Sequence, residues 1–303
     1  MIRSSRKHLA MIIHGARAER EDVRHLIDWV RGKGHLVEPK VTLEPGDGTA
    51  MAAAAARAGA DVVVALGGDG TINEVVNGLD GFDTPLGIIP LGTANDFATQ
   101  AGIPADADHA MDVILRRKPV RIDTASLNGR RFLNVSTGGV GAEATAETPA
   151  EAKETLGPMA YAITGVRKFA DFEPYGAAFA GPDFSFAGEF LMFAVGLTRA
   201  SGGGTLVTPK ASVTDGLLDV CIVESMGRGD FARLLLKIKR GEHLGEEGVH
   251  YVQLPWVTIE SKKTLSVNVD GETSDAQKLD YRSRAKDLWV HLVKLPGTDL
   301  EKL

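Results

Sequence analysis

The sequence lacks three features that would each point to a particular class of protein: paired cysteines, an excess of basic residues and a long apolar run. A lone cysteine, Cys221, cannot form a disulfide within the chain, so we expect a core residue in a reducing compartment. The formal net charge of −6 argues against a nucleic-acid partner, because such proteins need basic residues to neutralise phosphates. No stretch reaches the roughly 18 apolar residues that span a bilayer, so any membrane contact should be peripheral.

What is present is the composition of an ordinary globular protein, and 303 residues are more than a single core usually holds, so we expect two domains. Residues 1–120 alternate short apolar runs with amphipathic or alanine-rich segments, which predicts an α/β domain with a doubly wound parallel sheet. Residues 121–303 change to strands separated by glycine-rich turns, which indicates a mainly antiparallel β domain with helices near 150–170 and 230–240. The closing segment, 288–293, could return to either domain.

The strongest chemical signal is the loop GGDGT at residues 67–71, which follows an apolar strand at 62–66 and leads into a helix. Its glycines let backbone N–H groups approach a phosphate, and the helix N-terminus adds the positive end of its dipole. Asp69 would repel a phosphate unless Mg²⁺ lay between them. Thr71 and Glu74 fit a capping box at the start of the helix. Taken alone, the loop could also be a purely structural turn.

A second loop, LGTANDFA at residues 91–98, follows the apolar strand at 86–90 and again leads into a helix, with Thr93 and Asp96 spaced as a cap. Carboxyl ends of parallel strands meet at one edge of a sheet, so we expect the two loops to form one ligand-binding crevice. Neither loop has the P-loop or the dinucleotide-binding glycine pattern, which weakens both of those interpretations.

Two acidic turns lie in the second domain. Asp270 and Glu272, in NVDGE at 268–272, are two residues apart, and paired acids can accept a proton from a hydroxyl that attacks phosphorus. Asp-Gly is also a common turn, so a structural role is the alternative. The turn TDGLLD at 214–219 could ligate a hard cation through carboxylate and carbonyl oxygens, or could simply open the next strand.

Taken in order, these motifs resemble the diacylglycerol kinase catalytic-domain superfamily, and within it the bacterial YegS-like lipid kinases. The resemblance covers nearly the whole chain and rests on GGDGTINE at 67–74, PLGTANDFA at 90–98, DGLLD at 215–219 and DGE at 270–272. It implies a nucleotide-binding domain of the NAD kinase/phosphofructokinase type, followed by a sandwich-like β domain that takes the lipid.

The resemblance also implies an ATP-dependent kinase that phosphorylates a lipid hydroxyl, with phosphatidylglycerol or diacylglycerol favoured over sphingoid bases. It implies Glu272 as the proton acceptor, with Asp270 as its rival. A structural site for Mg²⁺, or alternatively Ca²⁺, would use the backbone carbonyls of Ser212 and Leu217 and the side chain of Asp215. The implied nucleotide site comprises Thr42, Gly68, Asp69, Gly70, Thr71, Ile72, Asn73, Glu74 and Thr93.

The chain departs from the family pattern in two places. Relatives often carry an Asn-Pro turn after the first strand, where this chain has HGA at 14–16, and an Asn-Gly pair where it has LT at 197–198. A further open question is the segment at 230–240, which could be an interfacial amphipathic helix or could pack its apolar side on the sheet.

Two other functions stay open. An NAD kinase-like enzyme shares the GGDG loop, but the loop at 90–98 resembles the lipid kinases instead. A non-catalytic lipid or nucleotide sensor is the third candidate, although all the expected acidic positions are present. For the lipid kinase we expect a cytoplasmic protein, monomer or homodimer, that meets its lipid substrate transiently at the inner face of the membrane and binds no nucleic acid.

Overall fold

A computed structural model describes residues 6–140 and 173–297, and it divides the chain into two compact units. Unit 1 takes its described residues from 1–124 and 286–303, whereas unit 2 takes them from 125–285. The segment 288–293 therefore lies in unit 1, and unit 1 continues slightly beyond the expected boundary after residue 120. The helix expected near 150–170 lies outside the described residues.

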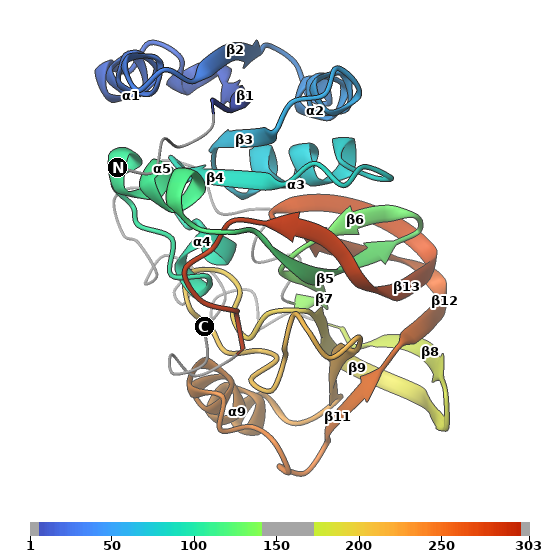
Figure 1. Ribbon diagram of the computed structural model, residues 1–303. Coiled ribbons are helices and arrows are strands. Elements are labelled where there is room, and N and C mark those ends of the chain that lie inside the picture. Colours follow the sequence, from blue (N-terminus) through green and yellow to red (C-terminus); the bar gives the residue numbers. More distant parts are fainter. Residues whose placement is uncertain (1–5, 141–172, 298–303) are drawn as a thin grey trace. The chain divides into compact units, whose positions relative to one another are not determined.

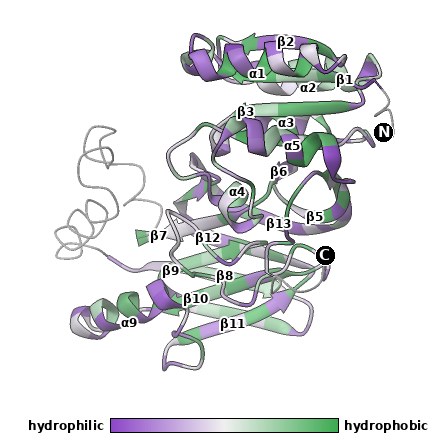
Figure 2. Ribbon diagram, turned by 60° about the vertical axis from the view of Figure 1, so that its left-hand side comes forward, coloured by the Kyte–Doolittle hydropathy of each residue, from purple (hydrophilic) through white to green (hydrophobic). Residues whose placement is uncertain are grey.

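Unit 1 is built on a parallel sheet with the strand order β4-β3-β1-β2 (Figure 1). Its strands are β1 (His8–His14), β2 (Leu36–Thr42), β3 (Val62–Gly67) and β4 (Leu86–Pro90). Every residue of β3 and β4 is buried, as expected for strands covered on both faces, and Figure 2 shows β3 as hydrophobic along most of its length. Val290 pairs in parallel with Leu86 on the outer side of β4.

The helices of unit 1 form two contacting pairs, α1 with α5 and α2 with α3, as expected for a doubly wound sheet with helices on both faces. They are α1 (Glu21–Gly32), α2 (Asp47–Arg57), α3 (Asp69–Gly78), α4 (Asp96–Gln100), α5 (Ala107–Arg116) and the 3₁₀ turn η1 (Gly15–Arg17). Small residues allow the second pair to approach closely: a Cβ on Gly78 would lie 2.3 Å from the carbonyl oxygen of Thr49. The predicted α/β fold class is confirmed.

The returning C-terminal segment is anchored in unit 1 by His291, which is 2% exposed. Its backbone N–H donates to the Leu86 carbonyl over 2.9 Å, and its Nδ1 lies 2.9 Å from the Arg117 carbonyl oxygen. Burial, assisted by the charge of Lys7, lowers the pKa of His291 to about 4, against the opposing effect of the Arg117 carbonyl. The ring is therefore neutral when the protein is folded at neutral pH.

We expect the protein to lose stability between pH 6.5 and pH 4. The pKa of His291 in the folded protein lies below that of an unfolded histidine, so the unfolded chain binds more protons in this window. The stability that the neutral His291 ring contributes is fully present above pH 6.5 and is lost as the pH falls. The loss should be about 2–3 kcal/mol. Urea unfolding at pH 7.5 and pH 5 of the wild type, His291→Asn and the exposed-residue control His25→Asn measures it. An unchanged pH dependence in His291→Asn would contradict the assignment.

Unit 2 is a mainly antiparallel β structure with the strand order β11-β10-β9-β7-β12-β13, in which β8 also pairs with β9 and β12. Two of its strands, β5 and β13, continue into unit 1. The strands are β5 (Val120–Leu127), β6 (Arg130–Phe132), β7 (Val135–Gly139), β8 (Tyr175–Gly181), β9 (Phe184–Gly196), β10 (Leu218–Glu224), β11 (Val249–Leu254), β12 (Trp256–Val269) and β13 (Glu272–Val290).

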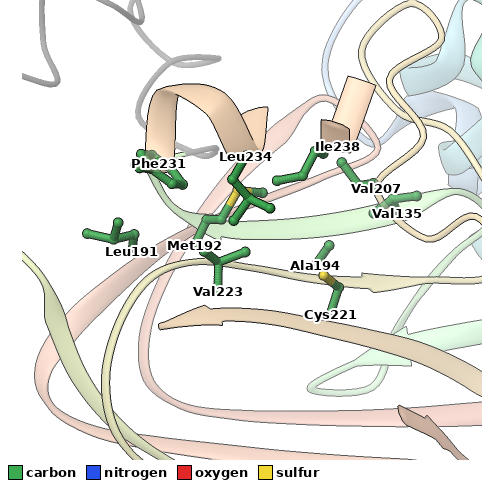
Figure 3. Close-up of a cluster of buried hydrophobic side chains, with 10 residues drawn as sticks. All are labelled: Val135, Leu191, Met192, Ala194, Val207, Cys221, Val223, Phe231, Leu234 and Ile238. Carbon is green, nitrogen blue, oxygen red and sulfur yellow. The ribbon is translucent and has the colours of Figure 1, made fainter. Parts of the chain in front are cut away.

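Helix α9 (Arg228–Arg240) packs its apolar side on unit 2, which is the second of the two roles left open for this segment. Phe231, Leu234 and Ile238 are buried against a cluster of strand and loop side chains (Figure 3). The rest of this cluster is Val135, Leu191, Met192, Ala194, Val207, Cys221 and Val223. Burial raises the pKa of the Cys221 thiol to about 12, which fits its expected role as a core residue.

No helix in the described part of the chain is long and apolar enough to cross a bilayer.

Candidate functional site

The two glycine loops of unit 1 touch each other backbone to backbone. Gly67 ends β3, and its carbonyl accepts a hydrogen bond of 2.9 Å from the N–H of Leu91, which follows β4. A Cβ on Gly92 would lie 2.5 Å from the Cα of Gly68 and 2.7 Å from the Oδ1 of Asn95. Only glycine fits at this approach, so the strand ends that the sequence predicted to be neighbours form one continuous surface.

A pocket of about 240 Å³ opens at this surface. It is lined by His14, Arg17, Gly68, Gly70, Thr71, Leu91, Gly92 and Thr93. Gly68, Gly70, Thr71 and Thr93 were expected at a nucleotide site, and Leu91 and Gly92 belong to the second loop that was expected to share the crevice. His14 and Arg17 were not among the expected site residues. The pocket combines glycine backbone, threonine hydroxyls and the N-terminus of α3, which are groups that bind phosphate.

The remaining expected residues lie around this pocket without lining it. Asp69 is the first residue of α3, and its Oδ2 accepts a hydrogen bond of 3.3 Å from the N–H of Asp96 at the start of α4. Ile72 and Asn73 are buried, and the Oδ1 of Asn73 accepts from Asn77, so neither side chain lies in the pocket. Thr42 is also buried, and its Oγ1 accepts a bond of 3.3 Å from Gly15 N–H, which supports the turn after β1.

The capping box predicted from Thr71 and Glu74 is wrong. Helix α3 begins at Asp69, with Gly68 as its N-cap and without a side-chain cap. The carboxylate of Glu74 instead accepts hydrogen bonds from the N–H groups of Gly46, over 2.9 Å, and Gly48, over 2.8 Å. Glu74 therefore holds the start of α2 against α3, and it supports the position of α3 without lining the pocket.

The second predicted cap, formed by Thr93 and Asp96, is also wrong. Helix α4 begins at Asp96 after Asn95, which has a left-handed φ of 48°. The Asn95 side chain accepts from the Gly92 N–H over 2.9 Å and donates to the Gly92 carbonyl over 2.8 Å. Asn95 thus holds the loop closed, which leaves Thr93 to line the pocket.

We expect Gly92→Ala to weaken nucleotide binding by at least about tenfold, because a clash at 2.5 Å with backbone must push the two loops apart. Titration with ATP and Mg²⁺ measures the affinity. Gly32→Ala is the matched control, because no atom lies within 4 Å of the Cβ that it adds. Equal affinities for the two variants would show that the contact between the loops is unimportant.

The two carboxylates of the DGE turn in unit 2 have different environments. Asp270 is 8% exposed, and its two oxygens accept hydrogen bonds from the N–H groups of Leu133, over 2.9 Å, and Asn134, over 3.0 Å. Glu272 is partly exposed and forms an ion pair with Arg130. Asp270 is therefore committed to the backbone of a neighbouring loop, whereas the Glu272 carboxylate is accessible to a substrate.

The expected structural metal ligands Ser212, Asp215 and Leu217 lie in one turn. Asp215 Oδ1 accepts a hydrogen bond of 3.0 Å from Leu217 N–H, and Ser212 Oγ lies 3.1 Å from the hydroxyl of Thr214. The described residues contain no cluster of three His, Cys, Asp or Glu side chains that could hold a metal. The all-oxygen donor set nevertheless suits a hard cation, provided that the backbone carbonyls take part.

Asp219 ends the DGLLD motif beside this turn and is fully buried. Burial raises its pKa to about 6, and the charge of Asp215 adds to this effect, whereas hydrogen bonds from Tyr251 and Gln253 oppose it. The Tyr251 hydroxyl donates to Asp219 over 2.5 Å. Asp219 therefore connects the turn to strand β11 and faces the interior of unit 2.

Comparison with known proteins matches both parts of the chain. A family model described as "Diacylglycerol kinase catalytic domain" matches residues 8–127, and one described as "YegS C-terminal NAD kinase beta sandwich-like domain" matches residues 135–290. A relative from Pseudomonas putida named "Probable lipid kinase YegS-like" is 38% identical over 285 residues, which are 93% of this chain and 94% of the relative. One of the same name from Xanthomonas campestris pv. campestris is 38% identical over 296 residues, 94% and 96% of the two chains.

Among solved structures, a diacylglycerol kinase from Bacillus anthracis str. Sterne gives a TM-score of 0.75. The match covers 95% of this chain and 98% of that chain. At 23% sequence identity, this likeness bears on the fold alone.

Proposed function

The chain belongs to the YegS-like lipid kinase family, and from that premise we propose that it transfers the γ-phosphoryl group of ATP to a hydroxyl of a membrane lipid, phosphatidylglycerol or diacylglycerol. The observation that carries this proposal is the contact between Gly68 and Gly92, which joins two loops beside one pocket of about 240 Å³ at the N-terminus of α3. A helix N-terminus lined with glycine backbone and threonine hydroxyls suits the phosphates of a nucleotide.

In unit 1, backbone N–H groups near Gly68 and Gly70 and the hydroxyls of Thr71 and Thr93 hold the nucleotide phosphates. Asp69, at the start of α3, is the carboxylate that would hold Mg²⁺. Mg²⁺, when bound, would neutralise part of the charge on the transferred phosphoryl group. The chain's own contribution is positioning, together with hydrogen-bond donors that stabilise the charge on the transferred phosphoryl group.

In unit 2, Glu272 accepts the proton of the lipid hydroxyl as its oxygen bonds to the γ-phosphorus. The bond from that phosphorus to the β–γ bridging oxygen breaks, and ADP leaves with the electron pair. Arg130, paired with Glu272, orients the carboxylate. Asp270 holds the loop at Leu133 and Asn134, so we assign it a positioning role and no proton transfer.

We further propose that the turn of Ser212, Asp215 and Leu217 holds a structural Mg²⁺ or Ca²⁺. We also propose that the protein contacts the inner face of the membrane peripherally. The side of α9 that does not pack on unit 2 supports this proposal. Leu236 on this side is 66% exposed, beside exposed Lys239. An exposed leucine with basic neighbours favours contact with a lipid surface.

The proposal is tested by transfer of labelled γ-phosphate from ATP and Mg²⁺ to phosphatidylglycerol, diacylglycerol, sphingosine and NAD, each assayed separately. Labelled phosphatidylglycerol or diacylglycerol would support the proposal and identify the substrate. Labelled sphingosine would support a lipid kinase but would refute phosphatidylglycerol and diacylglycerol as its substrates. Labelled NAD would move the protein to the NAD kinase-like alternative, and ATP binding without any labelled product would favour the sensor.

A further inference from the structure

The pocket in unit 1 contains a cation that the glycine motifs do not account for. His14 ends β1 and Arg17 ends the single turn of η1, and both residues line the pocket together with residues of the two glycine loops. This is the turn where the chain carries HGA at 14–16 in place of the Asn-Pro pattern. His14 belongs to this departure from the family pattern, and Arg17 directly follows it.

The turn that carries Arg17 is held firmly in place. The Ala18 N–H donates to the Gly15 carbonyl over 3.2 Å, and the Arg17 carbonyl accepts from Arg20 N–H over 3.2 Å. Gly15 packs on the end of β2: a Cβ there would lie 2.4 Å from the Thr42 carbonyl oxygen, and its N–H donates to the Thr42 hydroxyl. Arg17 thus projects from a short backbone segment that is fixed at both ends.

The guanidinium of Arg17 has no counter-charge. Across residues 6–140 and 173–297, no carboxylate forms an ion pair with it, whereas Arg20, three residues later, forms two hydrogen bonds with Asp22. The side chain is only partly exposed, and no acidic residue is among those that line the pocket. A partly buried cation without a counter-charge has lost some of its hydration, and an incoming anion compensates for that loss.

We propose that Arg17 binds the terminal phosphates of the nucleotide and makes the pocket selective for a triphosphate over a monophosphate. Arginine offers paired N–H donors that match two oxygens of a phosphate, and such charge-assisted bonds are among the stronger ones in proteins. His14, on the same rim, adds a ring nitrogen that can donate to a phosphate oxygen. This inference rests on the proposed use of ATP and adds a specificity-determining residue to it.

Removing the Arg17 guanidinium should weaken the binding of the β- and γ-phosphates of the nucleotide. Arg17→Gln should weaken ATP binding by about 10- to 100-fold, the range expected for a charge-assisted hydrogen bond. AMP binding should change by less than about threefold, because AMP lacks the β- and γ-phosphates. Arg17→Lys should retain part of the ATP affinity through its charge alone.

The experiment is calorimetric titration of the full chain with ATP, ADP and AMP in the presence of Mg²⁺. It compares the wild type with Arg17→Gln, Arg17→Lys and the control Arg20→Gln, whose exposed guanidinium is already bonded to Asp22. Melting temperatures without nucleotide show that each variant is folded. Selective loss of ATP in Arg17→Gln, with an unchanged control, is the expected result.

Two outcomes would overturn the inference. Arg17→Gln could bind ATP as the wild type does, or it could lose ATP and AMP affinity equally. Lipid phosphorylation measured alongside separates the two proposals. Wild-type lipid kinase activity with an unchanged KM for ATP in Arg17→Gln would refute only the role of Arg17. A wild type that binds no nucleotide and phosphorylates no lipid would refute both.

Discussion

Replacing Asp69 with asparagine should lower kcat for lipid phosphorylation by on the order of 10³-fold, because phosphoryl transfer depends on a correctly placed metal and on charge neutralisation. The amide keeps the shape of the side chain, and its oxygen can still accept the hydrogen bond from the Asp96 N–H. Only the negative charge is removed. The loss should therefore appear in the rate and in the Mg²⁺ concentration that the enzyme requires, and the melting temperature should stay close to that of the wild type.

The matched control is Asp106→Asn. Asp106 is the N-cap of α5 and accepts a hydrogen bond of 2.9 Å from His109 N–H, so it is another aspartate at a helix start, but its helix is not the one whose first turn lines the pocket. Asparagine caps helices about as well as aspartate, so activity and stability should both persist. If Asp69→Asn retained the wild-type rate and Mg²⁺ requirement, Asp69 would have no part in holding the metal.

Replacing Glu272 with glutamine should lower kcat by about 10²- to 10⁴-fold, the range for loss of a general base. The KM for ATP should change little, because Glu272 belongs to unit 2 and is not among the residues that line the pocket in unit 1. Glutamine can still accept a hydrogen bond from Arg130, so the turn should persist. Steady-state kinetics with varied ATP and fixed lipid separate the two parameters.

Two further variants make the test of Glu272 specific. Glu260→Gln removes another exposed carboxylate that is paired with a cation, Lys278, and it should leave the rate unchanged. Asp270→Asn should instead destabilise unit 2 by about 1–3 kcal/mol, because one of the two N–H groups at Leu133 and Asn134 would lose its acceptor. A larger loss of kcat in folded Asp270→Asn than in Glu272→Gln would exchange the two roles.

The sequence predicted best what depends on short stretches of chain. The apolar runs at 62–66 and 86–90 indicated buried parallel strands, and β3 and β4 occupy them because a sheet covered on both faces needs no polar alternation. The two glycine loops were likewise placed together correctly, since parallel strands end at one edge. Unit 2 was harder, because only a general pattern of strands and turns could be predicted. The irregular pairing of β12 with β13 between Glu260 and Leu265, for example, depends on a partner strand and not on local spacing.

Predictions that depended on side-chain partners failed where those partners are distant in sequence. Glu74 had the right spacing to cap its own helix, but it bonds to Gly46 and Gly48, 28 and 26 residues away. Local spacing carries no information about such a competitor. His14 was noted only as part of the HGA departure from the family pattern, and Arg17 was not predicted, since only the folded sheet brings the end of β1 to the two loops.

The acid pair shows how one turn can separate two similar side chains. Residues two apart in a strand point to the same face, so sequence alone left Asp270 and Glu272 as rivals. Asp270 takes a left-handed φ of 47° and Gly271 one of 92°, which ends the alternation between them. The result is one carboxylate turned inward to backbone N–H groups and one that stays accessible.

The discontinuity of unit 1 has a consequence for how the protein is made. Residues 125–285 are synthesised between β4 and the segment around Val290 and His291 that pairs along its edge. While a ribosome is still producing unit 2, the outer side of β4 has no partner from this segment, and unpaired strand edges are prone to associate with other chains. Synthesis of the segment around Val290 and His291 therefore closes the nucleotide-binding sheet, and nascent chains halted before residue 286 should depend on chaperones more than chains that contain this segment.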